Sequence, residues 1–566
     1  MTAVLLNLNK EPNLIKAIAQ QELWEISNFC NHVAHIDIYS KDINIFKLKG
    51  IHIAILGEII NINSLNKEDK FSYKRQEEFF LQFYKKYGFE KLHLLKGHFL
   101  IVLFEEQKQK IFIATDHFGS FPFYYSKEKE NIVLSTHLKP LFDFGLREKI
   151  VNKSAVADFF VYRYIPAPKT IWQNIHKIPA ASIMEINTAS LKVSERVYWD
   201  IQIHNTELKK QNPVAYFEEL FQESILNHAG GNKNQASFLS GGYDSSAIVY
   251  YLKKMHFNVL SFSLGFANWE KSEDYYAEKV AKHLKITNNK QVLNEESLNF
   301  IDNMPVVYEE PLADISIIPS FIAAKLASKN TNKVFSGEGA DEILAGYHWQ
   351  KEYYNKEFPK NWKDKIKKYL LGKENVLEFY AQAMGMGYFD EVNLKDLLHE
   401  DYYDALPDDV HWYYKKHFKS DWESLKAIQY LDMKCFMGAL VLPKITFATR
   451  ANNLKIAMPF LDPDIYNFIF NLPIEDYFKN HQTKYLLYEN IKEGLPKEVL
   501  ERKKQGFVGP DAYYMQMDWY EKQLKNSTLV KLNIIKQSFI DKMLEEDYNW
   551  KLWKILVLEK WAQKWL

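Results

Sequence analysis

The stretch ASFLSGGYDSSAIVYYL, residues 236–252, decides the fold of the larger part of this chain. Its pattern predicts an apolar strand that ends at Leu239, a turn over residues 240–245, and a helix that opens at Ser246. Glycines in such a turn let the backbone approach a ligand closely, and the N–H groups at a helix start attract anions. The stretch therefore predicts an anion-binding turn between a strand and a helix.

The side chains of this turn narrow the prediction. Ser240 and Ser245 add hydroxyl donors beside Gly241 and Gly242, which suits a polyphosphate. Asp244 belongs beside phosphate only if a divalent cation lies between them, so it is predicted to bind Mg²⁺. The alternative is an ordinary polar cap, which a bare Ser-Gly-Gly would be in roughly half of cases. No Gly-Lys-Ser/Thr follows, so this is not a Walker loop; it is similar to the loop of enzymes that split ATP between the α and β phosphates.

A second string, KVFSGEGADEILAGY at residues 333–347, repeats the arrangement. Phe335 ends a predicted strand, and the following turn carries the carboxylates of Glu338, Asp341 and Glu342 around two glycines. Ligands of open parallel sheets collect at the carboxyl edge of the strands, which is where both turns lie. A solvated acidic helix cap is the alternative interpretation. Two such turns on one sheet favour a shared site for phosphate and metal.

Composition excludes several classes of protein. The 566 residues include 72 basic and 72 acidic side chains, so no long-range positive field would collect nucleic acid or anionic lipid. Cys30 and Cys435 are the only cysteines, which argues against a disulfide framework and predicts a reducing compartment. No apolar run approaches the length of a membrane span and no signal peptide is recognisable. We expect a cytoplasmic protein without a nucleic-acid or membrane partner.

The pattern of apolar residues changes near residues 200–212. Before that point, short β-branched runs separated by Gly, Asp and Pro predict a β-rich region. From residue 201 onward, apolar strands alternate with long helical periodicities, which is typical of a parallel sheet wrapped by helices. After about residue 355 the pattern is almost entirely helical.

With these motifs in view, the chain resembles the asparagine synthetase family, and the resemblance extends over nearly its whole length. The fold it implies is α/β in two parts. Residues 1–200 would form a degenerate glutamine amidotransferase type 2-like domain, an αββα Ntn-hydrolase-like sandwich. Residues 201–566 would form an ATP-pyrophosphatase domain of the adenine nucleotide alpha hydrolase-like type, a parallel sheet with many helices. The strings that carry the resemblance are, in order, LKGHFLIVLFEE, ATDHFGSFPFYYS, VYRYIPAPKTIWQNIHKIPA, VYWD, SFSLGF, EEPLADISIIPS, MPFLDPDIYNFIFNLP and RKKQGFVGP.

The resemblance implies a role for each matching position. Asp244 and Asp341 would bind Mg²⁺ and pyrophosphate, and Glu338 would orient or deprotonate the incoming nitrogen. Lys504 would stabilise charge on the adenylate and its tetrahedral intermediate, although a solvated loop lysine is the alternative. The positions implied to hold ATP are Leu239, Ser240, Gly241, Gly242, Asp244 and Ser245 at the phosphates, Leu264 and Gly265 beside the adenine, and Ser336 and Gly337 near the ribose or α-phosphate.

The chain departs from the family at its N-terminus. Class II glutaminase domains use an N-terminal cysteine that is exposed by removal of methionine, and here the second residue is Thr2. Cys30 is internal and Cys435 lies in the other half, so neither replaces it. The family's arginine-containing substrate loop is also missing. The first domain is therefore predicted to be a retained scaffold without glutaminase activity.

A second departure lies in the region that binds the acceptor in the family. Charged positions there are replaced by Thr446, Phe447, Lys455 and Ala457, and Tyr488 stands where an arginine is usual. Losing three arginines and two acids removes bidentate recognition of a carboxylate, so aspartate is not the predicted substrate. β-Lactam synthetases and lasso peptide cyclases share this combination of departures, and their substrates supply the attacking nitrogen.

The sequence thus predicts an enzyme, an ATP-dependent carbon–nitrogen ligase with ATP and Mg²⁺ as cofactors. It would form an amide through an acyl-adenylate, release AMP and pyrophosphate, and use ammonia or a substrate amine but not glutamine. One alternative is an intramolecular cyclase of natural-product biosynthesis, acting on a small-molecule or peptide carboxylate. Another is a catalytically silent nucleotide-binding homologue. RNA modification ranks last because the chain lacks a basic surface. A homodimer is one assembly that the sequence leaves open.

Overall fold

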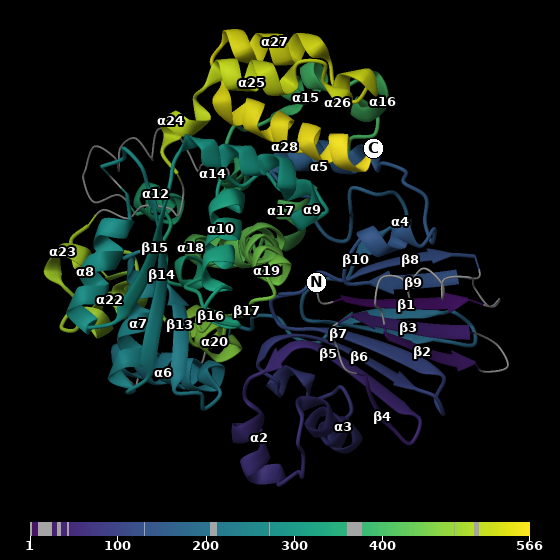
Figure 1. Ribbon diagram of the computed structural model, residues 1–566, viewed down its shortest axis with the longest axis vertical. Coiled ribbons are helices and arrows are strands. Elements are labelled where there is room, and N and C mark those ends of the chain that lie inside the picture. Colours follow the sequence, from purple (N-terminus) through teal and green to yellow (C-terminus); the bar gives the residue numbers. More distant parts are fainter. Residues whose placement is uncertain are drawn as a thin grey trace. The chain divides into compact units, whose positions relative to one another are not determined.

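The computed structural model describes residues 3–9, 25–30, 35–41, 45–129, 131–203, 212–270, 272–358, 376–479, 482–502 and 509–566. The chain forms two compact units (Figure 1). The first contains Met1–Asn152, Ala167–Asp200 and Arg450–Lys455, and the second contains Lys153–Pro166, Ile201–Thr449 and Ile456–Leu566. A single boundary at residue 200 therefore differs from this division at two segments. Residues 153–166 belong to the second unit, and residues 450–455 belong to the first.

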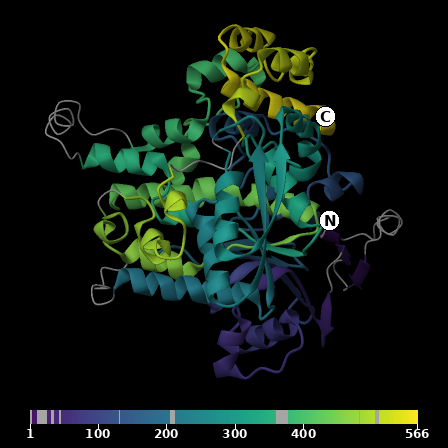
Figure 2. The same cartoon turned by 60° about the vertical axis from the view of Figure 1, so that its left-hand side comes forward.

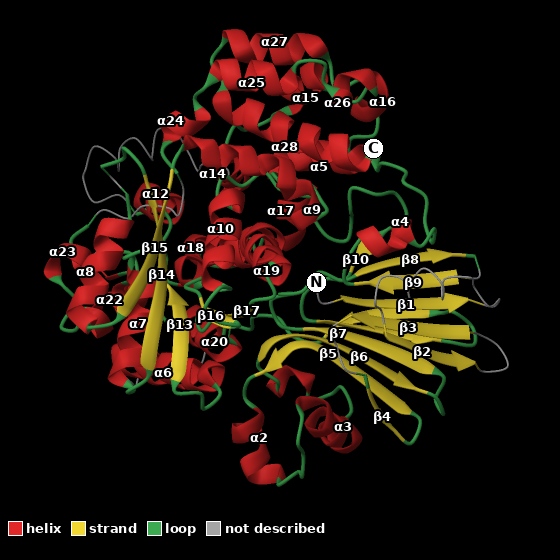
Figure 3. Ribbon diagram, viewed as in Figure 1, coloured by secondary structure: helices red, strands yellow, loops and turns green. Residues whose placement is uncertain are grey.

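The first unit is built on two six-stranded sheets, drawn in yellow in Figure 3. The neighbouring strands of both sheets pair in antiparallel orientation. The first sheet has the order β10-β8-β9-β1-β3-β2 and the second β12-β11-β7-β6-β5-β4. The strands are β1 (Ala3–Asn9), β2 (Glu25–Cys30), β3 (His35–Lys41), β4 (Phe46–Leu48), β5 (Ile51–Ile59), β6 (Gly97–Glu105), β7 (Lys110–Thr115), β8 (Tyr124–Glu128), β9 (Asn131–Ser135), β10 (His176–Lys177), β11 (Ser182–Asn187) and β12 (Val193–Val197).

Alternation along β5 explains the layers of this unit, because successive side chains of a strand point to opposite faces. Ala54 and Leu56 join an apolar cluster that includes Leu6 of β1 and Leu134 of β9, and this cluster fills the space between the sheets. The residues Ile53 and Ile55 join a second cluster with the aromatic face of α3. The helical segments among its described residues include α2 (Ile62–Asp69), α3 (Gln76–Tyr87), the 3₁₀ turn η1 (Leu92–Leu94) and α4 (Lys139–Asp143). This arrangement confirms the predicted amidotransferase-like sandwich.

The second unit is built on one five-stranded sheet of the order β15-β14-β13-β16-β17. Strand β13 pairs in parallel with both β14 and β16, and β14 pairs in parallel with β15. The predicted parallel sheet is therefore confirmed. Its strands are β13 (Asn234–Phe238), β14 (Asn258–Phe266), β15 (Thr287–Leu293), β16 (Lys333–Phe335) and β17 (Lys455–Ala457).

Helices make up most of the second unit. The α5 helix (Lys153–Tyr162) belongs to it, although it comes early in the sequence. The last helices, α25 to α28, pack together around α28, as the two views in Figures 1 and 2 show. Among the described residues, no helix is both long and apolar enough to cross a membrane. The remaining helical segments are α6 (Pro213–Ala229), α7 (Tyr243–Lys254), α8 (Asp274–Leu284), η2 (Glu295–Asn303), α9 (Met304–Tyr308), α10 (Ile317–Ala327), α11 (Ala340–Ile343), α12 (His348–Glu357), α14 (Val376–Gly385), α15 (Glu391–Leu397), α16 (Glu400–Tyr403), α17 (Trp412–His417), α18 (Ser424–Leu431), the π-helical η3 (Asp432–Val441), α19 (Leu442–Ala451), α20 (Pro463–Asn471), α21 (Ile474–Tyr477), α22 (Tyr485–Ile491), α23 (Lys497–Leu500), α24 (Asp511–Tyr514), α25 (Met517–Leu524), α26 (Thr528–Lys531), α27 (Gln537–Glu545) and α28 (Asn549–Trp565).

Candidate active site

Hydrogen bonds to the hydroxyls of two serines close the loop between β13 and α7 into a turn. The Ser240 backbone N–H donates to the Ser245 hydroxyl at 3.1 Å, and the Gly242 N–H donates to the Ser240 hydroxyl at 3.2 Å. Gly241 has a φ of +73°, and a Cβ there would lie 2.5 Å from that of Tyr276, so both backbone and space require glycine. The result is a tight turn that ends at a helix N-terminus, which is the geometry predicted for binding phosphate.

The helix opens earlier than its sequence predicts. It begins at Tyr243 and not at Ser246, because the bond from the Ser246 N–H to the Gly242 carbonyl at 3.0 Å already closes a helical turn. Asp244 and Ser245 therefore lie in the first turn of α7, where the positive end of the helix dipole favours an acidic side chain and a bound anion.

The second loop leaves β16 and touches the first. Phe335 pairs with Ser237 of β13, so the two strands end at the same edge of the sheet. A Cβ on Gly337 would lie only 2.8 Å from that of Asp244, which requires glycine at this point of contact. Gly339 turns the chain with a φ of +97° just before α11. The two sequence motifs thus lie side by side, as predicted.

Lys484 joins the two loops, and the sequence analysis did not single it out. Its ammonium lies 2.6 Å from Oδ1 of Asp341 and between 2.5 and 2.6 Å from the two carboxylate oxygens of Asp244. The residue is 4% exposed and precedes α22 with a left-handed φ of 56°, and its N–H is held by the Leu344 carbonyl at 2.8 Å. Burial alone would lower its pKa, but the two aspartates outweigh burial and hold the pKa of Lys484 above its usual value.

The same aspartates suit a magnesium ion. Two carboxylates share one ammonium, so the group keeps a negative charge, and both aspartate side chains remain about one fifth exposed. In the part of the chain that the structure describes, no group of three or more His, Cys, Asp or Glu side chains could hold a metal alone. Mg²⁺ is usually bound by one or two carboxylates together with water and substrate phosphates, so Asp244 and Asp341 fit it in the presence of a nucleotide.

Glu338 lies in the field of four charged groups. Burial raises its pKa, and the carboxylates of Asp341, Asp244 and Asp314 raise it further, while the ammonium of Lys444 opposes them. A glutamate with a raised pKa next to a reaction centre is suited to accept a proton.

Lys444 and Asp314, two of the charged groups that act on the pKa of Glu338, also contact each other. The Lys444 ammonium donates to the Ser316 hydroxyl at 2.8 Å and lies 3.8 Å from Asp314, and both charged groups are buried. Burial would raise the pKa of Asp314, but Lys444, Arg163 and the Ser316 hydrogen bonds keep it below its usual value. Asp314 is therefore held as a carboxylate.

Two family models match the chain, one in each region. The asparagine synthase model matches residues 216–563, and the glutamine amidotransferase domain model matches residues 39–199. The chain belongs to the asparagine synthase family. Its two touching loops and their charged residues lie inside the synthase match.

Similar curated proteins agree with this family. Asparagine synthetase [glutamine-hydrolyzing] 1 of Bacillus subtilis (strain 168) is 27% identical over 544 residues, which cover 89% of this chain and 84% of that protein. The putative asparagine synthetase [glutamine-hydrolyzing] of Mycobacterium bovis is 24% identical over 556 residues, covering 89% and 83%. Amidase chyE of Penicillium rubens is 21% identical over 530 residues, covering 82% and 78%. This asparagine synthase-family chain is accordingly an ATP-dependent ligase that forms a carbon–nitrogen bond.

The residues predicted beside the adenine lie on the neighbouring strand. Phe262 of β14 pairs with Phe238, so Leu264 lies level with Ser240 of the phosphate loop. Leu264 is buried, and a Cβ on Gly265 would lie 2.5 Å from the carboxyl carbon of Asp274. The structure thus brings Leu239, Ser240, Leu264 and Gly265 to one end of the sheet, and their contact with adenine stays a prediction.

Lys504 lies outside the described residues, so its predicted role stays a prediction. The segment before it is anchored at the site by Arg502. That guanidinium donates to the Ser240 carbonyl at 3.3 Å, lies 2.5 Å from Glu273 and covers the Tyr276 ring at 4.7 Å. Burial raises the pKa of Glu273 to about 7 against the opposing charge of Arg502.

The five positions at which the chain departs from the acceptor region of the family are here called the altered wall, and most of them are apolar or bonded within the protein. The Thr446 hydroxyl donates to the Leu442 carbonyl at 2.7 Å, and the buried Phe447 ring lies 6.4 Å from that of Tyr308. Tyr488 lies beside the Tyr243 ring at 6.1 Å. The other two altered positions are Lys455, which pairs with Glu58 at 2.9 Å within the first unit, and Ala457, which is buried in β17.

Two further acids lie behind the second loop. The Tyr347 hydroxyl donates to Glu342 at 2.6 Å, and burial together with Asp341 raises the pKa of Glu342 to about 8. Asp432 opens the π-helical η3 and accepts hydrogen bonds from Tyr380 at 2.8 Å and Gln350 at 2.6 Å; burial nevertheless raises its pKa to about 7. Both acids are buried and accept hydrogen bonds from side chains within the protein.

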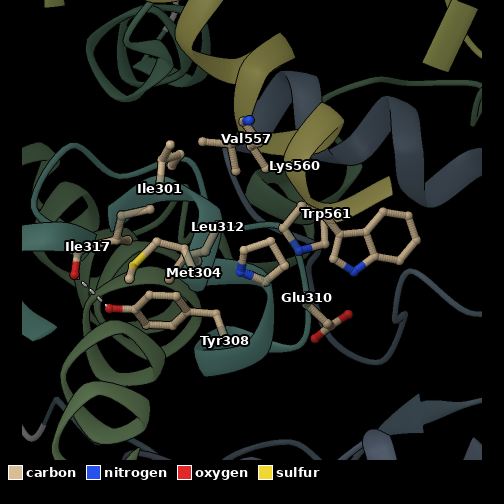
Figure 4. Close-up of a pocket in the computed structure, with 11 residues that line it drawn as sticks. Ile301, Met304, Tyr308, Glu310, Leu312, Ile317, Val557, Lys560 and Trp561 are labelled. Carbon is tan, nitrogen blue, oxygen red and sulfur yellow. Dashed lines mark hydrogen bonds between the residues drawn. The ribbon is translucent and has the colours of Figure 1, made fainter. Parts of the chain in front are cut away.

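A small cavity lies behind the segment that carries Asp314 (Figure 4). Its lining includes Met304, Tyr308, Leu312 and Trp561. Its free volume is ≈ 10 Å³, which is room for about one water molecule. It is too small for a substrate.

Proposed function

We propose that this chain activates a carboxylic acid with ATP as an acyl-adenylate and then transfers the acyl group to ammonia or to a substrate amine. The observation that carries the proposal is Lys484, which lies between Asp244 and Asp341 where the two loops touch. A polyphosphate at that point would meet a helix N-terminus, one ammonium and two carboxylates suited to Mg²⁺.

In the first step, a carboxylate oxygen of the acid attacks the α-phosphorus of ATP, and pyrophosphate leaves. The loop of Ser240 and Ser245 would hold the phosphates, while Asp244 and Asp341 would hold Mg²⁺. Bound Mg²⁺ neutralises phosphate charge and polarises phosphoryl oxygens. The Lys484 ammonium stabilises negative charge as it develops, because its position is already fixed by the protein before the reaction.

In the second step, the nitrogen attacks the acyl carbon, AMP leaves with the former carboxylate oxygen, and the nitrogen loses a proton. Glu338 is the carboxylate suited to accept that proton, because its pKa is raised from that of an ordinary glutamate. The products are the amide, AMP, pyrophosphate and a proton, and all atoms of the three substrates, ATP, the acid and the nitrogen donor, are accounted for.

We infer that glutamine is not the nitrogen donor. The chain has Thr2 where class II glutaminases need a cysteine, and Cys435 is buried in η3 of the other unit. Thr2 itself lies outside the described residues. Ammonia or an amine carried by the substrate is the remaining source, and the apolar positions Phe447 and Ala457 favour a substrate other than aspartate. An intramolecular cyclase is the second candidate on that ground.

Pyrophosphate exchange tests the proposal. With a panel of carboxylic acids and no amine, the chain should move ³²P from pyrophosphate into ATP for at least one acid, and Asp244→Asn should abolish the exchange. Exchange stimulated by aspartate would favour asparagine formation over a different acid. Tight Mg-ATP binding without exchange or AMP release for any acid would instead favour a silent nucleotide-binding homologue.

A further inference from the structure

Arg163 is a buried cation for which the described residues provide almost no acceptor. It lies just beyond α5 in the second unit and is 8% exposed. Its Nη1 donates to the Met386 sulfur at 3.6 Å, its Nε has no hydrogen-bond partner, and no described carboxylate forms an ion pair with it. A guanidinium carries five N–H donors, and leaving a buried charge without acceptors is costly.

The position of Arg163 ties it to the active site. Its carbonyl accepts the N–H of Ala313 at 2.8 Å, and the next residue, Asp314, has its pKa lowered in part by the Arg163 charge. Asp314 in turn acts on the pKa of Glu338. Arg163 also has a φ of +73°, which is unfavourable for a residue with a side chain.

The side chains around Arg163 are largely aromatic, and Arg163 with Phe436, Tyr347 and Trp349 is here called the Arg163 subsite. The guanidinium lies over the Phe436 ring at 5.6 Å, and that ring lies 5.6 Å from Tyr347 and 5.9 Å from Trp349. Phe436, Tyr347 and Met386 are half-buried, whereas Arg163 and Trp349 are buried. Tyr347 follows α11 in the chain, and α11 opens directly after the loop that carries Glu338, so the subsite and that loop belong to neighbouring segments.

We propose that the Arg163 subsite binds a second carboxylate of a substrate, remote from the carboxyl group that is activated. The planar guanidinium of arginine can donate two parallel hydrogen bonds to one carboxylate. Weakly polar surroundings strengthen the ion pair that these two groups form. The altered wall places Phe447 and Tyr488 where charged residues are usual in the family, and Arg163 supplies a guanidinium from a different part of the chain. The proposal rests on the proposed function, since the acid or the amine would carry this carboxylate.

Binding of a simple probe tests the subsite without any turnover. Benzoate, with benzamide as its neutral match, would be titrated against the full chain at constant ionic strength while the Tm is followed. Arg163→Gly removes the guanidinium and suits the left-handed backbone, so it should fold at least as well as the wild type. Lys497→Met removes an exposed lysine that pairs with Glu501 in another part of the chain and serves as the matched control for the loss of one positive charge.

We expect benzoate to bind the wild type and Lys497→Met alike, and Arg163→Gly at least about 10-fold more weakly, because one charge-assisted bidentate pair is lost. Benzamide should not distinguish the three proteins. Equal benzoate affinity for wild type and Arg163→Gly, or no binding by either, would overturn the proposal, and neither result depends on whether the chain forms an adenylate.

Kinetics then identify which substrate carries the carboxylate. In the first case, an acid that supports pyrophosphate exchange occupies the subsite. Arg163→Gly should then raise the KM for that acid, as measured by pyrophosphate exchange. If the amine occupies it, exchange stays unchanged and only the KM of the amine in AMP release rises. In both cases the KM for ATP stays unchanged. The proposal would be contradicted if Arg163→Gly lowered activity equally with a substrate and with its analogue in which the second carboxylate is a carboxamide.

Discussion

Asp116 of the first unit and the aspartates Asp244 and Asp341 of the second unit are held by the protein in different ways. In the first unit, Asp116 is buried and accepts the N–H groups of Phe99, Phe118 and Ser120 as well as the Ser120 hydroxyl. These bonds oppose the effect of burial, which raises the pKa of Asp116 to about 6. In the second unit, Asp244 and Asp341 compete for one lysine and stay partly exposed. The hydrogen-bonded Asp116 supports the fold of its unit, whereas the partly exposed pair is consistent with our proposal that Asp244 and Asp341 bind Mg²⁺ and a nucleotide.

The largest effect should follow from removing the lysine that joins the two loops. Lys484→Met is expected to lower AMP formation by ~10³-fold, because a preorganised charge at the developing negative charge is lost. Lys492→Met, which removes an exposed lysine of the same segment that pairs with Glu489, should leave the rate unchanged. A Lys484→Met protein with normal Tm and activity within about tenfold of wild type would contradict this role.

Replacement of the predicted base should separate the two steps. Glu338→Gln is expected to lower amide formation by ~10²-fold while pyrophosphate exchange continues, because proton removal is needed only after the adenylate forms. Glu498→Gln, an exposed glutamate near Tyr275, is the matched control. Equal loss of exchange and amide formation would place Glu338 in nucleotide or acid binding instead.

The raised pKa of Glu338 also predicts a pH dependence. A base must be deprotonated to act, so kcat/KM for the amine should fall as the pH drops through a value above the 4.5 of an ordinary glutamate. This acidic limb should be missing in Glu338→Gln. If the fall of kcat/KM at low pH is the same in Glu338→Gln as in the wild type, a group other than Glu338 causes it.

Stability should respond more weakly to the buried acids behind the loop. The folded pKa of Glu342 is about 8, above the 4.5 expected on unfolding, so the folded state binds its proton more tightly. The free energy of unfolding should therefore fall as the pH rises from 4.5 to 8, and Glu342→Gln should flatten that fall. Asp432, with a pKa of about 7, should account for part of the remaining slope in urea titrations. A free energy of unfolding that falls more steeply with pH in Glu342→Gln than in the wild type would contradict this assignment.

The smallest effect is expected in the first unit. Thr2→Ala should leave ammonia- or amine-dependent amide formation unchanged, because no hydroxyl at that position is needed when glutamine is not the donor. Glutamate release from glutamine, measured with and without the substitution, is the direct check. Release that disappears in Thr2→Ala would show that a threonine nucleophile survives.

The sequence predicted both loops and their proximity because strand, turn and helix are local patterns and parallel strands end at one edge. It placed the start of α7 three residues late, since Asp244 and Ser245 were assigned to the turn and not to the first helical turn. It missed Lys484 and Arg163, whose importance arises only when distant segments pack against the sheet. Lys484 precedes an ordinary amphipathic helix, and Arg163 comes from the region that was assigned wholly to the first domain.

The origin of the oxygen in AMP tests the central claim most directly. Turnover of an acid labelled with ¹⁸O in its carboxylate should place one labelled oxygen in AMP and none in pyrophosphate, because the carboxylate attacks the α-phosphorus held at Asp244, Asp341 and Lys484. Label recovered in inorganic phosphate, with ADP as the nucleotide product, would contradict the account.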